Sequence, residues 1–326
     1  MFMNVREVCS QMNSHAMQGK DFLFAFDFEL KEGIFVANPL EQKDIWFEIE
    51  GMGNVTDFPE VKTERIIFNS CGVDRARYMQ GFDIASKALQ RGDSFLLNLT
   101  AKTPIMTNLS LEDIFMVSKA RYKLLVKNSF VCFSPECFIR TEEDRIYTYP
   151  MKGTIDADIP QAEKILSDNP KEQAEHYTIV DLMRNDLNRI SSEVSVERFR
   201  YFERIDTMKG PILQTSSEIS GILPDNWRSH AGDIMLELLP AGSISGAPKK
   251  ATVETIRLAE KERRGFYTGV FGYFDGKNLE SAVMIRYIEQ EGSRLFFRSG
   301  GGITVNSRAE DEYMETEQKI YLPLSI

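Results

Sequence analysis

Runs of apolar and polar residues divide the chain into strand-like and helix-like stretches. Strands, with alternating or continuous apolar positions, are predicted at 22–28, 33–38, 44–51, 94–103, 129–140, 144–155, 194–223, 266–278 and 279–290. Helices are predicted at 74–90, 110–122, 160–168, 171–189, 229–239 and 242–262. No internal repeat or Pro/Ser-rich linker interrupts this order. The pattern predicts one α+β domain with long antiparallel strands and helices outside them.

The composition and net charge of the chain indicate which kinds of binding partner to expect. The chain has 326 residues, of which 42% are hydrophobic and 27% charged, and these values are ordinary for a soluble globular protein. Its 39 basic and 49 acidic residues give a net charge of −10, so a broad nucleic-acid-binding surface is not expected. An anionic substrate must therefore be met by local cations.

Cysteine spacing and hydropathy indicate where the protein works. The four cysteines form no CxxC pair and no metal-ligand spacing with the three histidines, which is typical of reduced thiols in a cytosolic protein. Residues 1–20 lack the apolar core of a signal peptide. No stretch approaches the roughly 20 apolar residues that a membrane helix requires. We expect a cytoplasmic protein with no membrane partner.

The most informative stretch is SGGGITVNSRAEDEYMETEQK, residues 299–319. Its three consecutive glycines follow a strand-like run and can point backbone N–H groups at an anion. In the helix-like segment beyond them, Glu312, Glu315 and Lys319 recur at i, i+3 and i+7, which places them along one helix face. Taken alone, such a helix is more often a solvated face, and a glycine run is more often a turn.

A second carboxylate pair, Glu172 and Glu175, has the same i, i+3 spacing at the start of another predicted helix. Two such pairs on separate helices can supply oxygen ligands to Mg²⁺. That ion usually takes one or two carboxylates and leaves room for substrate oxygens and water. The repeated spacing therefore favours a magnesium site over a solvated face.

The segment 242–262 begins like an anion-binding helix. Gly242 and Gly246 permit a tight turn, Pro248 is tolerated in a first helical turn, and two lysines follow at once. A carboxylate or phosphate would be stabilised there. An ordinary capped helix is the alternative, and the sequence alone does not decide between them.

Eight motifs, in order and spacing, resemble those of chorismate-utilising enzymes. They are SPExFI (134–139), PxKGT (150–154), EHxxIVDLMRNDL (175–187), GSISGAPK (242–249), YTGxxGY (267–273), IR (285–286), SGGGI (299–303) and EYxETxxK (312–319). The resemblance runs from about residue 75 to the end of the chain. Within the family, the chain is most similar to the component I group of aminodeoxychorismate synthase, also called para-aminobenzoate synthase.

The resemblance implies a fold and a domain organisation. It implies a single chorismate-binding domain, residues 1–326, built of two stacked, mostly antiparallel β-sheets flanked by outer helices. Residues 1–74 would be a shortened N-terminal portion that contributes strands, and residues 75–326 would be the catalytic core. Full-size relatives have a longer N-terminal portion that binds tryptophan in some members. No LLES-like inhibitor motif is visible here, so tryptophan feedback is not expected.

The resemblance also implies an activity, the amination of chorismate at C4 with ammonia. The product would be 4-amino-4-deoxychorismate, for para-aminobenzoate and folate biosynthesis. Lys152 is the discriminating residue, because relatives that make anthranilate have alanine there. Relatives that make isochorismate or salicylate carry a base lysine on an earlier strand, where this chain has Leu96. Lys152, in its neutral form, would attack C2, and Glu136 would protonate the departing C4 hydroxyl as general acid.

Further roles follow from the resemblance residue by residue. Glu175 and Glu315 would hold Mg²⁺, with Glu172 and Glu312 as direct or water-mediated neighbours. Gln214 stands where many relatives have a histidine, which serves pyruvate elimination in the anthranilate enzymes. The residues expected to bind the substrate are Thr154, Gln214, Ser243, Tyr267, Arg286, Gly300, Gly301, Gly302 and Lys319.

Ammonia raises the question of a partner. None of the cysteines lies in the G-x-C-x-G elbow of a glutaminase, and no C-terminal His-x-Glu follows. The family therefore implies a separate glutamine amidotransferase subunit, component II, as the source of ammonia. Two alternative hypotheses remain open at this point. One is anthranilate synthase component I, and the other is a non-catalytic subunit that has retained the pocket.

Overall fold

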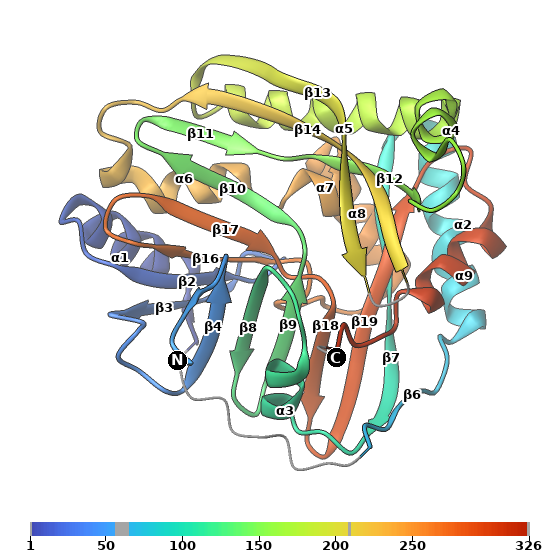
Figure 1. The fold of residues 1–326 in the computed structure, drawn as a ribbon, viewed down its shortest axis with the longest axis horizontal. Coiled ribbons are helices and arrows are strands. Elements are labelled where there is room, and N and C mark those ends of the chain that lie inside the picture. The colour runs from blue at the N-terminus through green and yellow to red at the C-terminus, as the bar shows by residue number, and fades with distance from the viewer. Residues whose placement is uncertain (1, 56–64, 208–209, 325–326) are drawn as a thin grey trace.

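Two antiparallel β-sheets cross each other and are covered by helices on their outer faces (Figure 1). This computed structural model describes residues 2–55, 65–207 and 210–324. Every strand pairing among these residues is antiparallel. The prediction of an α+β fold with two stacked antiparallel sheets is confirmed.

Among the described residues, the first sheet has ten strands. In spatial order they are β1 (Phe2–Asn4), β3 (Glu32–Ala37), β2 (Phe22–Phe26), β16 (Val270–Phe274), β17 (Leu279–Val283), β10 (Cys137–Glu142), β11 (Arg145–Thr148), β14 (Gly210–Ile222) and β12 (Met151–Asp156). The tenth strand, β13 (Ser192–Thr207), pairs with β14. The strand structure predicted through 194–223 is confirmed as the two strands β13 and β14. Positions 208 and 209 lie outside the described residues.

The second sheet has nine strands in the part of the chain that the structure describes. In spatial order they are β15 (Gly246–Ala247), β7 (Leu96–Thr107), β19 (Arg294–Ile303), β18 (Tyr287–Glu291), β9 (Phe130–Ser134), β8 (Tyr122–Val126), β4 (Ile45–Ile49) and β5 (Met52–Gly53), while β6 (Phe68–Ser70) pairs with β7. Positions 56–64, within the predicted N-terminal portion, lie outside the described residues.

Helices lie on the outer faces of both sheets (Figure 1). They are α1 (Val5–Met17), α2 (Arg75–Arg91), α3 (Leu111–Val117), α4 (Ala162–Asp168), α5 (Pro170–Asn188), η1 (Trp227–His230), α6 (Ala231–Leu238), α7 (Gly242–Ser245), α8 (Lys249–Glu260) and α9 (Ala309–Gln318). Among the described residues, no helix has both the length and the apolar character needed to cross a membrane.

Three groups of buried apolar side chains hold these layers together. Phe271 of the first sheet and Phe47 of the second belong to the group between the sheets. Phe24 packs on the outer side of the first sheet in a group that includes Met235 of α6. Phe115 of α3 belongs to the third group, on the outer side of the second sheet. Removal of apolar area from water on both sides of each sheet fixes the layer order.

Two predicted helices need correction. The helix predicted at 110–122 ends at Val117, because Ser118 already has extended backbone angles, and Tyr122 begins strand β8. The helix predicted at 242–262 is interrupted at Gly246, whose φ of 113° lies in a region that favours glycine. Gly246 pairs with β7 as part of β15, and α8 starts only at Lys249.

The stretch predicted as one strand at 129–140 passes from one sheet to the other. Its first part is β9 of the second sheet, and its second part is β10 of the first. The chain makes the reverse passage between β17 and β18. Backbone hydrogen bonds connect the two passages. The Phe133 N–H donates to the Arg286 carbonyl at 3.1 Å, and the Val283 N–H donates to the Glu136 carbonyl at 3.2 Å. Glu136 and Arg286 are thereby placed at the junction of the sheets.

His176 of α5 joins this helix to the β13–β14 pair. Its side chain is fully buried, and its Nε2 lies 2.7 Å from the Ser217 Oγ. The same hydroxyl accepts the Arg200 N–H at 2.9 Å. Burial, followed by the nearby positive charge of Arg200, lowers the pKa of His176 to about 4. The fold therefore contains a neutral His176 at neutral pH.

Acid should weaken the fold through this histidine. The folded-state pKa of His176, about 4, is below the ordinary value of 6.5. The contribution of the neutral histidine to the free energy of unfolding is therefore complete above pH 6.5 and is lost as pH falls toward 4. The loss for this one group is about 3 kcal/mol. Urea unfolding of the wild type and of His176→Gln at several values between pH 7.5 and 4.5 measures it. The variant should show a shallower fall in unfolding free energy, and equal slopes would contradict the assignment.

Candidate functional site

The glycine run of β19 forms a free edge of the second sheet. Strand β18 pairs with β19 only as far as Arg298, so among the described strands the glycines have β7 alone as a neighbour. The Gly300 carbonyl points away from β7 and accepts a hydrogen bond from the Lys319 Nζ at 2.8 Å. In an antiparallel strand a residue's N–H and C=O lie on the same side, so the N–H groups of Gly300 and Gly302 face this edge.

Helix α9 lays three charged side chains directly against the backbone of Gly301. A Cβ atom at that position would lie 3.4 Å from the Glu315 Oε1, 3.5 Å from the Lys319 Nζ and 3.6 Å from the Glu312 Oε2. Lys319 and Glu315 form an ion pair of 2.7 Å, and the Ser307 hydroxyl donates to Glu312 at 2.7 Å. The missing side chain lets the charged groups reach the strand.

Lys152 of β12 reaches the same glycine run and connects it to side chains of α5. The Lys152 Nζ lies 3.3 Å from the place of a Cβ on Gly302, and 3.3 Å from the Glu175 Oε2. Gly153 has a φ of 84°, and a Cβ there would lie only 3.0 Å from the Glu172 Oε2. Glu312 and Glu315 thus lie against the glycine run directly, while Glu175 is connected to it through Lys152.

The glutamates affect one another's protonation. Burial raises the pKa of Glu172, and the charge of Glu175 raises it further. Burial also raises the pKa of Glu312, and Glu315 adds to this effect, although the hydrogen bond from Ser307 opposes it. In both cases burial is the main cause, and the neighbouring carboxylate adds to it. Within the described residues, no three acidic, histidine or cysteine side chains are grouped closely enough to hold a metal ion as they stand.

Nearby lysines balance part of this charge. Burial opposes the ionisation of Glu315, but Lys319, followed by Lys152 and Lys171, lowers its pKa below the ordinary value. Lys171 Nζ also lies 3.9 Å from the Glu175 Oε1. Lys152 and Glu175 are 23% and 15% exposed, so their ion pair is largely shielded from solvent. The site therefore combines acidic and basic groups at close range.

Glu136 faces this group from the junction of the sheets. Burial raises the pKa of its carboxyl, while the hydrogen bond from Ser243, at 2.6 Å, and the charges of Lys152, Arg286 and Lys319 oppose the shift. A carboxyl of this kind holds a proton at higher pH than an exposed glutamate and can act as a general acid.

Arg286 and Tyr267 lie at the same junction. Arg286 has a φ of 52°, in the left-handed region, and its guanidinium lies 5.2 Å from the centre of the Tyr321 ring. Tyr267 is buried, and burial raises the pKa of its hydroxyl to about 12, so the hydroxyl is neutral and can donate a hydrogen bond. Its ring lies 5.7 Å from that of Tyr287.

Two of the predicted substrate residues are less closely tied to this group. Thr154 is exposed, two residues beyond Lys152 on β12. Gln214 pairs opposite Thr154 in register and is half-buried. The register shift between Met151 and Thr154 separates these two from the lysine. The other predicted residues gather around the glycine edge and the sheet junction.

Some neighbours of the site were not predicted as functional. They are Lys171, His176, Glu260, Arg264 and Ser307. His176 lies inside the EHxxIVDL motif, and Glu260 and Arg264 precede the YTG motif, so their positions were visible in the sequence. Their burial was not visible, because spacing alone does not distinguish a solvated i, i+4 ion pair from a buried one.

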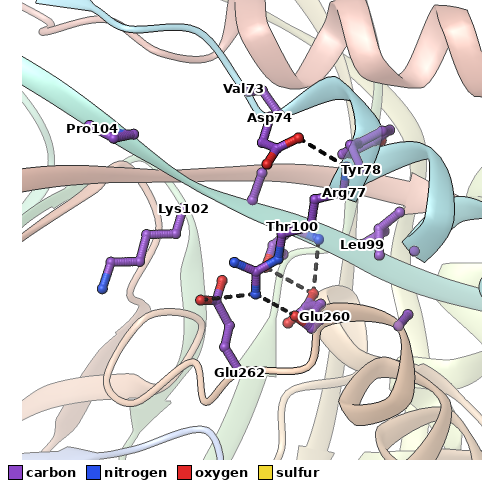
Figure 2. Close-up of a pocket in the computed structure, with 13 residues that line it drawn as sticks. Val73, Asp74, Arg77, Tyr78, Leu99, Thr100, Lys102, Pro104, Glu260 and Glu262 are labelled. Carbon is purple, nitrogen blue, oxygen red and sulfur yellow. Dashed lines mark hydrogen bonds and ion pairs between the residues drawn. The ribbon is translucent and has the colours of Figure 1, made fainter.

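A cavity of about 240 Å³ lies on the helix side of β7 (Figure 2). None of the residues predicted to bind the substrate lines this cavity, so it is not the predicted site. The residues that line it are Val73, Asp74, Arg77, Tyr78, Gly81, Leu99, Thr100, Ala101, Lys102, Pro104, Ala259, Glu260 and Glu262.

Comparison with curated proteins gives relatives along the whole chain. An uncharacterized PabA-like protein of Pasteurella multocida is 51% identical over 325 residues, 99% of this chain and 100% of the relative. A PabA-like protein of Haemophilus influenzae is 51% identical over 96% of this chain and 95% of its own. Aminodeoxychorismate synthase component 1 of Salmonella typhimurium is 32% identical over 76% of this chain but only 56% of its own.

Solved structures agree on the fold. A putative 2,3-dihydroxybenzoate-specific isochorismate synthase of Bacillus anthracis matches 98% of this chain and 88% of its own with a TM-score of 0.73 and 17% identity. The menaquinone-specific isochorismate synthase of Escherichia coli matches 98% of this chain and 82% of its own with a TM-score of 0.74, also at 17% identity. The family model for chorismate binding enzymes matches residues 35–325. This chain therefore belongs to the family of chorismate-binding enzymes.

Proposed function

We propose that the protein is an aminodeoxychorismate synthase of the component I type, which aminates chorismate at C4 to 4-amino-4-deoxychorismate. The observation that carries the proposal is the position of Lys152, whose Nζ lies beside the glycine edge and 3.3 Å from Glu175. A relative of that name is 32% identical over 76% of the chain. The proposal extends to a place in para-aminobenzoate and folate biosynthesis in the cytoplasm.

The donor set around the glycines fits a hard divalent cation. Carboxylate oxygens are the ligands that Mg²⁺ prefers. Burial, to which a neighbouring carboxylate adds, raises the pKa values of Glu172 and Glu312, and a bound cation would favour their charged forms. Glu175 and Glu315 would be its principal ligands, with Glu172 and Glu312 as neighbours. When bound, the ion would neutralise the ring carboxylate of chorismate and polarise the conjugated ring.

The protein's own residues would hold the rest of the substrate. The N–H groups of Gly300 and Gly302 face the open strand edge and would donate to the enolpyruvyl carboxylate. The Arg286 guanidinium and the Tyr267 hydroxyl would bind the same end of chorismate, together with Ser243. Lys319 would add positive charge beside Gly300, whose carbonyl it already contacts at 2.8 Å. Fixed donors of this kind orient the ring without reorganising during the reaction.

Two residues would carry the bond changes. The Lys152 nitrogen would form a bond to C2. At the same time the C4 hydroxyl would take a proton from Glu136 and leave as water. Ammonia would then bond to C4 as the bond between Lys152 and C2 breaks, and the new ammonium group would return one proton to the Glu136 carboxylate. Both the neutral lysine and the acid are thereby regenerated, and the pyruvyl group stays attached. The ion pair between Lys152 and Glu175 must loosen before the lysine lone pair is available.

Ammonia would come from a separate glutamine amidotransferase subunit. The chain carries no glutaminase motif of its own. Free ammonium at sufficient concentration should replace that partner in an assay. This simplifies the test, because the chain alone can then be supplied with chorismate, Mg²⁺ and ammonium.

The product formed under those conditions tests the proposal. We expect 4-amino-4-deoxychorismate, detected by mass after chromatography, with no release of pyruvate. Anthranilate with pyruvate would instead indicate the anthranilate synthase reaction. Active, folded protein that binds chorismate but forms neither product would contradict the proposed function and favour a binding subunit.

Replacement of Lys152 tests the nucleophile. Lys152→Ala should lose amination at C4 because the bond to C2 is not formed, while chorismate binding should persist. Lys164→Ala, an exposed lysine on the neighbouring helix α4, is the matched control and should retain full activity. Rate and product measured by mass would give the answer, and an unchanged rate of C4 amination in Lys152→Ala would remove the lysine from its role.

Replacement of the glutamates tests the cation site. Glu175→Gln and Glu315→Gln each remove a negative ligand, so the Mg²⁺ concentration for half-maximal activity should rise at least about tenfold. Glu310→Gln on the same helix α9 is the control, because Glu310 pairs with Arg75 at an exposed position. Titration of Mg²⁺ by calorimetry gives a second readout that is independent of turnover. Equal Mg²⁺ affinity in all three variants would show that Glu175 and Glu315 are not ligands of the ion.

A further inference from the structure

Strand β7 has a gap along the edge that faces away from the glycine run. It pairs with β15 at Leu96 and Leu97, and with β6 from Ile105 onward, but among the described strands none pairs with the stretch between. A backbone N–H that points into such a gap needs another partner. The Thr100 N–H finds one in the Glu260 Oε1, at 2.9 Å (Figure 2).

The carboxylate of Glu260 is itself held by Arg264. The Arg264 Nε donates to the Glu260 Oε2 at 2.9 Å, and the Nη2 donates to the Oε1 at 2.6 Å. The two side chains are 0% and 2% exposed. The Thr100 hydroxyl donates to the Glu260 Oε1 as well, at 2.9 Å. Glu260 is therefore a bidentate partner of the arginine and also the cap of the open strand edge.

The remaining N–H groups of Arg264 reach three other segments. The Nη2 also donates to the Asn98 carbonyl at 2.7 Å, and the Nη1 donates to the Ile244 carbonyl and to the Thr268 hydroxyl, each at 3.2 Å. With the two bonds to Glu260, all five N–H donors of the guanidinium are used. Lysine could not reproduce this planar arrangement.

Outside the pair itself, each residue that hydrogen-bonds to the side chain of Arg264 or Glu260 is next to a residue of the proposed substrate site, either along the chain or across a strand pair. Ile244 follows Ser243, and Thr268 follows Tyr267. On β7, Asn98 and Thr100 lie opposite Gly302 and Gly300. Three segments, at residues 98–100, 244 and 268, therefore converge on one buried guanidinium and one carboxylate.

Thr268 shows that this contact constrains the backbone. Its φ of 59° lies in the left-handed region, which is unfavourable for a β-branched residue. The hydroxyl of Thr268 accepts from Arg264 and donates to the Tyr267 carbonyl at 2.6 Å, while its N–H donates to the Met284 carbonyl at 2.8 Å. Strained residues persist where surrounding contacts over-determine them, and here they do so next to the proposed site.

We infer that Arg264 and Glu260 are a buried positioning pair, which sets the spacing of the glycine edge, Ser243 and Tyr267 and so determines the affinity for chorismate. The inference rests on the proposed substrate site. Neither side chain belongs to the set that contacts the substrate, so the pair acts through its neighbours. Loss of one member leaves charged or polar groups unpaired in the interior, and the segments must then move.

Two conservative variants test the pair. Glu260→Gln keeps the shape but removes the charge, and Arg264→Lys keeps the charge but removes the fork. Each should lower kcat/KM for chorismate by about 100-fold, mainly through KM, because displacement of binding groups by about 1 Å has effects of that size. Equilibrium dialysis of chorismate should show the same loss of affinity. Unchanged KM and Kd in folded variants would overturn the inference.

Rescue by a small carboxylate distinguishes positioning from general stability. Glu260 lines the cavity of about 240 Å³ and a second cavity of about 450 Å³, so acetate has a route to the space left in Glu260→Ala. Acetate should bring the chorismate Kd of this variant back toward the wild-type value, and chloride at equal ionic strength should not. Equal effects of the two anions, or rescue of melting temperature without rescue of Kd, would overturn the inference.

An ion pair elsewhere, in which the lysine is buried and the glutamate is 30% exposed, gives the control. Lys123 of β8 pairs with Glu48 of β4 at 2.8 Å, and the lysine side chain is 6% exposed. Lys123→Met should lower the melting temperature yet leave the chorismate Kd unchanged, and an equal loss of affinity in this control would contradict a specific role for Arg264 and Glu260. Because Kd does not depend on the product formed, a failure of the proposed amination would be seen separately in the product assay.

Discussion

Backbone exposure at the glycine run is the constraint on which the rest of the site depends. The Glu315, Lys319 and Lys152 head groups lie 3.3 to 3.5 Å from where a Cβ would be at Gly301 or Gly302, so a side chain longer than alanine there would compete with them for space. Strand β19 is therefore both a wall of the site and a source of N–H donors. Charged groups from two helices and one strand meet there because nothing else fills the space.

The crossing of the two sheets supplies the remaining groups. Glu136 and Arg286 lie where the chain passes between sheets, and hydrogen bonds between the two passages fix them relative to each other. Such corners leave local backbone groups and side chains outside regular ladders, which is where reactive residues can be placed without disturbing the core. Burial at the same corner raises the pKa of Glu136, so the fold also prepares its proposed chemistry.

Local pattern predicted much of this, and tertiary context determined the rest. The i, i+3 glutamate pairs and the motif around Lys152 were visible in the sequence. The structure places the pair of α9 at the glycine run and connects the pair of α5 to it through Lys152 and Gly153. The helix predicted at 242–262 is divided into α7 and α8 because Gly246 pairs with β7, a contact that no short window contains. The stretch 129–140 has a strand pattern throughout, yet nothing in its periodicity indicates that β9 and β10 belong to different sheets. The ion pair of Glu260 and Arg264 has a spacing typical of exposed helices, and only packing makes it buried.

The central claim is that the Lys152 nitrogen becomes covalently attached to the substrate ring. Rapid acid quenching of the enzyme with chorismate and Mg²⁺ but without ammonia, followed by intact-protein and peptide mass spectrometry, tests it most directly. The account predicts an added mass of chorismate less one water, located on the peptide that contains Lys152 and absent when ammonium is supplied in excess. An enzyme that aminates chorismate but shows no such adduct, or carries it on another residue, would contradict the account.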